Sequence, residues 1–107
     1  MARALIHMPK TAKADEVIEI RALIAHPMES GYRPGADGKT VAQDIIRQFT
    51  CRYDGEQVFA AELHPAISAN PYIAFFTVAT TTGTLEFTWS GDNGFSQVEH
   101  MALAVAP

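Results

Sequence analysis

The stretch from Asp44 to Leu63, DIIRQFTCRYDGEQVFAAEL, contains the pattern that decides the fold. Residues 44–53 and 56–63 are rich in β-branched and aromatic residues, and Asp54 and Gly55 separate the two runs. A two-residue type I′ turn needs a positive φ at both positions, and an Asp-Gly pair tolerates this well. The stretch therefore predicts two antiparallel strands joined by a tight hairpin.

Similar short runs recur along the chain between Gly, Pro, Asn and Asp residues, without a sustained helical period. Five more strands are predicted at residues 3–8, 16–25, 72–80, 84–90 and 95–105. The motifs TTTG (80–83) and GDNG (91–94) indicate two further hairpin turns. Seven strands in one domain of 107 residues predict an all-β fold, an immunoglobulin-like sandwich of two antiparallel sheets.

The charge of the chain argues against nucleic acid as a partner. Its formal net charge is −4, from 8 basic and 12 acidic residues, and it has no basic run. All basic residues lie in residues 1–52, so the second half is strongly acidic. We interpret that half as a solvated acidic surface or, alternatively, as a face that attracts a basic partner. No apolar run is long enough to insert into a membrane, and MARALIHMPK at the start lacks the features of a signal peptide.

The one cysteine, Cys51, is predicted to be structural. Because side chains alternate along a strand, Cys51 shares a face with Phe49 and Tyr53 and should point into the core. A buried thiol has a raised pKa and is a poor nucleophile. Common catalytic and nucleotide-binding motifs are missing from the sequence, so no catalytic residue is predicted. A hydrolase with an unrecognised carboxylate site is the least favoured alternative.

Histidine and methionine pairs leave a metal-binding alternative open. His26 and Met28, together with His7 or His100, offer imidazole and thioether ligands of the kind that bind copper. However, no short ligand spacing is present, and Cys51 has no histidine nearer in sequence than His64. We therefore predict no metal site and no cofactor, and keep a small copper- or ligand-binding sandwich as the alternative.

A partner face is predicted from strand parity. In TLEFTWS (84–90) one face is apolar and the other polar, whereas in YIAFFTVAT (72–80) both faces are apolar. If the even-numbered face packs in the core, the odd-numbered face is exposed and available to a partner. The 18-residue loop 26–43 is expected either to contribute to this face or to fold over it. The predicted partner residues are Ile73, Phe75, Phe59, Met28 and Tyr32.

Three motifs together resemble the SoxZ family, a subunit of the SoxYZ carrier of bacterial thiosulfate oxidation: AHPMESGYR (25–33), ANPY (69–72) and FTWSGDNG (87–94). The resemblance covers essentially the whole chain. It implies a non-catalytic immunoglobulin-like subunit that forms a heterodimer with SoxY, whose C-terminal cysteine carries the sulfur intermediate. Other Sox enzymes would act on this complex.

The resemblance also implies a periplasmic location, reached by export together with SoxY. The chain ends in HMALAVAP and lacks the Gly-Gly-Cys-Gly-Gly tail of the carrier subunit. It is therefore expected to be the companion of the carrier, and Cys51 is not expected to hold the substrate.

Overall fold

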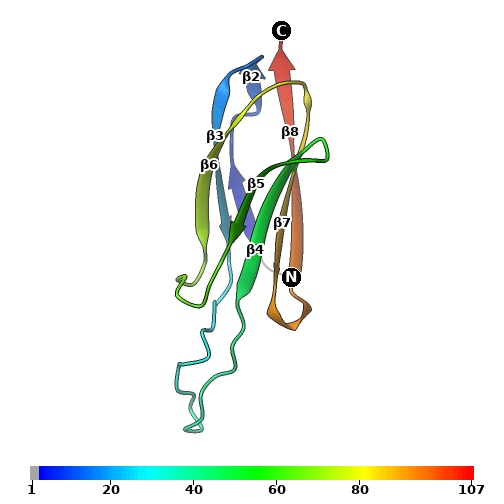
Figure 1. The fold of residues 1–107 in the computed structure, drawn as a ribbon. Helices are drawn as coiled ribbons and strands as arrows, with labels where there is room; N and C mark the ends of the chain where they lie inside the picture. Colours follow the sequence, from blue (N-terminus) through cyan, green and yellow to red (C-terminus); the bar gives the residue numbers. More distant parts are fainter. Residues whose placement is uncertain (1–2) are drawn as a thin grey trace.

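Two β-sheets pack face to face in a computed structural model that describes residues 3–107 (Figure 1). The three-stranded sheet has the order β1 (Ala4–His7), β3 (Val17–Ile24) and β6 (Tyr72–Val78). The five-stranded sheet has the order β2 (Thr11–Lys13), β8 (Ser96–Ala106), β7 (Gly83–Gly91), β4 (Ile46–Tyr53) and β5 (Glu56–Glu62). All neighbours are antiparallel except β2 and β8, and a 3₁₀ turn (Asp92–Gly94) joins β7 to β8. The prediction of an all-β sandwich is confirmed.

All seven predicted strands are present, within one or two residues of their predicted ends. The β4–β5 hairpin is confirmed, with φ of 50° at Asp54 and 86° at Gly55. The structure adds β2, which has only three residues, too few for an alternating pattern to be recognised in the sequence. The hairpin predicted at TTTG is wrong, because residues 79–82 cross from β6 in one sheet to β7 in the other. A turn motif marks a reversal of the chain but does not tell which sheet the next strand joins.

The core lies between the sheets and is built from alternate side chains of their facing strands. Leu85, Phe87 and Trp89 of β7 are fully buried, as predicted. The Phe49 ring of β4 packs against Phe87 and Trp89, with centroid distances of 6.3 and 5.1 Å. Burying side chains of this size stabilises a fold by roughly 1.5–3 kcal/mol each. The sandwich is therefore held together mainly by apolar packing.

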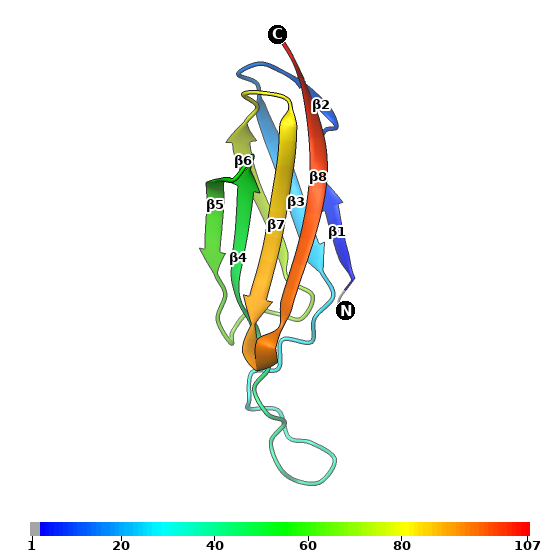
Figure 2. The ribbon, with the colours of Figure 1, turned by 90° about the vertical axis from the view of Figure 1, so that its right-hand side faces the viewer.

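The connection from β3 to β4 extends beyond one end of the sandwich as an elongated loop (Figure 2). We call residues 29–44 the finger. At its base Glu29 and Asp44 exchange two backbone hydrogen bonds of 2.8 Å, and a second bridge joins Pro34 and Thr40. The finger contributes to the long axis of the molecule, which measures 60 Å against 20 and 19 Å for the other two. Within residues 3–107, no helix has the length and apolarity needed to cross a membrane.

Candidate functional site

The outer surface of the three-stranded sheet carries a continuous set of exposed apolar side chains. On β6 the even-numbered residues face outward, and Phe76 and Tyr72 are 64% and 58% exposed. Aromatic side chains with this exposure are typical of protein interfaces and unusual elsewhere on a monomer. We call this surface the apolar face. Its apolar members are Leu5, Val17, Leu23, Tyr72, Ala74, Phe76 and Val78.

The strand register places these side chains beside one another. Leu5 pairs with Leu23, and Leu23 pairs in turn with Tyr72, which makes one apolar row across all three strands. Val17 pairs with Val78 toward the other end of the face. Side chains paired in this way lie within contact distance across neighbouring strands. Between these two ends, Ala74 and Phe76 continue the apolar surface along β6, beside Arg21 and Glu19 of β3.

Two charged residues of the apolar face, Arg21 and Glu19, neutralise each other. Arg21 and Glu19 form an ion pair at 2.9 Å on β3, and His7 of β1 pairs in register with Arg21. An exposed ion pair contributes little to stability. Its consequence here is that Arg21 and Glu19 together add no net charge to the apolar face, whose other cation, Arg3, lines one of its cavities.

Two shallow cavities indent this face at the end nearest the finger. One has a volume of about 160 Å³ and lies between Leu5, Leu23 and Tyr72, with Arg21 and His7 at its rim. The second, of about 270 Å³, shares Leu5 and Leu23 and extends to Asn70. Apolar side chains of a partner would find complementary hollows at these positions.

The prediction that the odd-numbered face of β6 is exposed is wrong. Phe75 is 4% exposed and its ring stacks on Phe59 of β5, with centroids 4.3 Å apart and planes at 11°. Ile73 is also partly buried and packs against the core. The structural reason is that β6 is apolar on both faces, so parity alone did not tell which face turns inward. The exposed surface is the even-numbered one.

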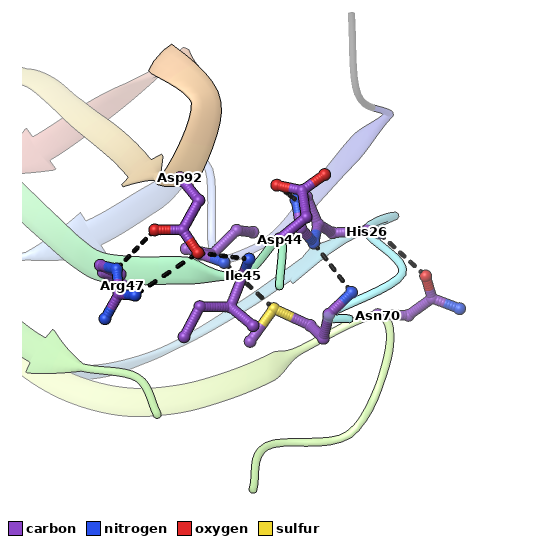
Figure 3. Close-up of polar contacts among 8 residues, drawn as sticks. His26, Asp44, Ile45, Arg47, Asn70 and Asp92 are labelled. Atoms are coloured by element: carbon purple, nitrogen blue, oxygen red, sulfur yellow. Dashed lines mark hydrogen bonds and ion pairs between the residues drawn. The ribbon is translucent and has the colours of Figure 1, made fainter. Parts of the chain in front are cut away.

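Met28, also predicted for the partner face, is 5% exposed and anchors the finger to the sandwich. Its Sδ atom accepts a hydrogen bond from the backbone N–H of Ile46 at 3.3 Å. Its own N–H donates to Nδ1 of His26 at 3.0 Å, so Nδ1 carries no proton and Nε2 does. That nitrogen lies 3.9 Å from Oδ1 of Asp44 (Figure 3). Met28 is therefore a buried support and not a surface contact.

Two more polar contacts fix the base of the finger, and sequence reasoning missed both (Figure 3). The side chain of Asn70, in the loop before β6, accepts a hydrogen bond from the backbone N–H of His26 at 3.0 Å. Asp92 accepts from Arg47 Nε at 2.6 Å and from the backbone N–H of Ile45 at 3.2 Å. The hydrogen bond from Arg47, followed by that from Ile45, lowers the pKa of Asp92. Both contacts link residues more than 40 positions apart, which no local pattern reveals.

Tyr32 is the one predicted partner residue that is well exposed, at 82%. It lies on the finger next to Arg33, which forms a bidentate ion pair with Glu29. This hydrogen-bonded pair lowers the pKa of Glu29 and raises that of Arg33. The finger therefore presents an aromatic ring beyond the end of the sandwich. That Tyr32 contacts a partner remains a prediction.

The residues of the copper alternative are not brought together. Nδ1 of His26 and Sδ of Met28 already accept backbone hydrogen bonds, whereas His100 lies on β8 beside Glu86, 3.2 Å away. His7 belongs to the apolar face of the other sheet. Among the described residues, no group of three His, Cys, Asp or Glu side chains is arranged to hold a metal ion.

Cys51 is fully buried, as predicted from its position on β4. Burial raises the pKa of its thiol from 9.0 to about 12. The thiol is therefore protonated at neutral pH, which makes it unreactive toward sulfur compounds or oxidants. Its role is to fill the core.

Comparison with known proteins gives a family. None of the curated proteins compared with the chain matches it. A superoxide reductase (neelaredoxin) from Ignicoccus hospitalis is 17% identical with a TM-score of 0.73, over 96% of this chain and 79% of that one. The sulfur carrier protein SoxY from Chlorobium limicola is 11% identical with a TM-score of 0.68, over 97% of this chain and 79% of that one. At these identities the solved structures share the fold alone. The family model of the sulphur oxidation protein SoxZ matches residues 6–102, so the chain belongs to the SoxZ family.

Proposed function

We propose that this chain is the non-catalytic companion of SoxY in thiosulfate oxidation, and that it binds SoxY through the apolar face. Membership of the SoxZ family places the chain in sulfur oxidation. The single observation that supports a binding role is the apolar face, with Phe76 and Tyr72 exposed on its edge strand β6. Covering such side chains removes apolar area from water, which is the main favourable term in protein association.

The chemistry of the apolar face suits a protein partner better than a small molecule. Its cavities are shallow and shared between neighbouring strands, whereas its aromatic residues stand out from the sheet. Tyr and Arg are enriched at energetically important interface positions, and both occur here as Tyr72 and Arg21. A stable interface buries about 800 Å² on each partner. The molecule measures 60 Å along its long axis and 20 and 19 Å along the other two, so one face of the sandwich is large enough for an interface of this area.

In this arrangement the sandwich is a rigid support. SoxY would carry the sulfur intermediate, and this chain would stabilise SoxY while the finger reaches past the end of the two domains. Tyr32 at the finger is then a candidate contact for SoxY or for another Sox enzyme that acts on the complex. We also propose that the chain is located in the periplasm together with SoxY, which fractionation of cells expressing both chains would test.

The binding proposal is tested by purifying the chain with SoxY and measuring the dissociation constant by calorimetry. Phe76→Ala should weaken binding by at least tenfold, because truncation of an aromatic residue at an interface commonly costs more than 1.4 kcal/mol. Val98→Ala is a matched control, because Val98 is 43% exposed on β8 of the opposite sheet. Absence of a complex, or an equal effect of both substitutions, would overturn the proposal.

A further inference from the structure

The open edges of the two sheets differ in a way that singles out β6. An unpaired edge strand offers its backbone N–H and C=O groups to any extended chain, and folded proteins usually blunt such edges. Four strands lie at edges here, namely β1, β6, β2 and β5. Short length, charge, proline and bulges are the common means of protection.

Three of the four edges show these means. β1 has only four residues, and β2 has three residues that include Lys13. β5 begins at Glu56 and ends at Glu62, and its register against β4 shifts at Val58. A bulge at this point bends the strand and interrupts its edge. Each of these three edges is therefore protected against pairing with an added strand.

β6 has none of the four means of protection. It has seven residues, YIAFFTV, with no charge and no proline. Its pairing with β3 runs without a register shift from Leu23 and Tyr72 to Val17 and Val78. Among residues 3–107, no strand pairs with its other edge. β6 is therefore a long, regular and uncharged open edge.

The hydrogen bonds at its two ends show which backbone groups are free. The carbonyl of Pro71 accepts from the N–H of Ile24, and the N–H of Ala79 donates to the carbonyl of Glu16. Because the direction of the backbone N–H and C=O groups alternates along a strand, those of the odd-numbered residues of β6 point toward β3. The backbone N–H and C=O groups of the even-numbered residues point toward the open edge. These residues are Tyr72, Ala74, Phe76 and Val78.

These four residues also supply the side chains of the apolar face, so edge and face are continuous. Beside the edge, a cavity of about 480 Å³ lies between the end of β6 and the β4–β5 hairpin. Thr77 and Val78 line it on one side, and Tyr53 and Val58 on the other. An added strand would meet free backbone groups, an apolar surface and room for a side chain.

We propose that an extended segment of SoxY adds to β6 as a fourth strand of the three-stranded sheet. The inference rests on the proposed binding of SoxY and specifies its geometry. SoxY from Chlorobium limicola has the same fold as this chain, with a TM-score of 0.68, so it has sheet edges of its own to offer. Backbone pairing sets the register, whereas Tyr72 and Phe76 provide apolar contact.

Amide hydrogen exchange tests this geometry directly. In the free chain, the even-numbered amides of β6 should exchange quickly and those of Ile73, Phe75 and Thr77 slowly. In the complex with SoxY, the amides of Ala74 and Phe76 should slow by at least tenfold. A complex in which they exchange as in the free chain would overturn strand addition and leave SoxY binding intact. Absence of any complex would overturn both proposals.

A pair of variants supplies a second readout. Ala74→Pro removes an N–H that no internal partner uses, and proline is tolerated at such edge positions. Ala74→Ser retains the N–H and adds only a small side chain. We expect the proline variant to weaken SoxY binding by at least tenfold and the serine variant by less than threefold. Equal affinities of the two variants would overturn strand addition, and if the proline variant does not fold, the exchange measurement decides.

Discussion

The ring of Phe59 stacks on the ring of Phe75, with centroids 4.3 Å apart, and so connects β5 of one sheet to β6 of the other. Phe75 also meets Phe49 in an edge arrangement at 6.1 Å. These contacts lie near the side where β5 and β6 are open edges. The stack therefore closes the core where no strand pairing does, and it turns the even-numbered residues of β6 outward.

Two adjacent residues of β6 should consequently differ sharply in their effect on stability. Phe75→Ala leaves a cavity beside Phe59 and Phe49 and should lower the free energy of unfolding by about 3–5 kcal/mol. Phe76→Ala removes an exposed ring and should change it by less than about 0.5 kcal/mol. Urea denaturation of both variants measures the difference. Similar losses would show that the two faces of β6 are equally packed.

Much of the fold could be predicted from the sequence, because strands such as β7 of the five-stranded sheet alternate clearly. Strand β7 has only one plausible orientation, because one side carries Leu85, Phe87 and Trp89 and the other carries Glu86. β6 has apolar residues on both sides, so its orientation depends on Phe59, a residue of another sheet. The alternation of residues on β6 predicted an exposed apolar face, but the prediction assigned it to the odd-numbered residues, whereas the even-numbered residues are exposed.

The base of the finger could not be predicted for a related reason. The sequence indicated a long loop after His26, but the residues that hold the loop come from three distant segments. Met28 was interpreted as a surface residue because nothing near it in sequence marks it as buried. Only the fold brings Asn70 beside His26 and Asp92 beside Ile45.

Asn70 combines two roles that substitutions can separate. It has a φ of 55° and its side chain accepts a hydrogen bond from the N–H of His26. Asn70→Gly loses the hydrogen bond alone, which should cost about 1 kcal/mol. Asn70→Ala loses the bond and also holds an alanine in the left-handed conformation, which Gly and Asn adopt more readily, at a further cost of about 1 kcal/mol. Chemical denaturation should therefore rank the alanine variant below the glycine variant, and the opposite order would contradict this account.

The contact of Asp92 with Arg47 and Ile45 should make stability depend on pH in the acid range. Because these hydrogen bonds lower the pKa of Asp92 in the folded chain, its contribution is complete above the pKa of the unfolded chain. It is lost as pH falls through the lower folded value. Asp92→Asn cannot titrate, so its stability deficit relative to the natural chain should shrink between pH 6 and pH 3. A deficit that is constant over this range would show that the contact does not form in solution.

Cys51 should make stability depend on pH in the alkaline range, with the opposite sign. Burial raises the pKa of its thiol from 9.0 to about 12, so above pH 9 the thiol ionises in the unfolded chain and stays protonated in the folded one. This ionisation stabilises the unfolded state, so at pH 10 the free energy of unfolding should be lower by about 1 kcal/mol. Cys51→Ala carries no thiol and is the control, because lysine and tyrosine residues titrate alike in both chains. We expect the stability of the natural chain to fall relative to this variant between pH 8 and pH 10.5. Parallel curves would mean that the thiol is accessible to solvent, in which case a thiol reagent should also modify the folded chain.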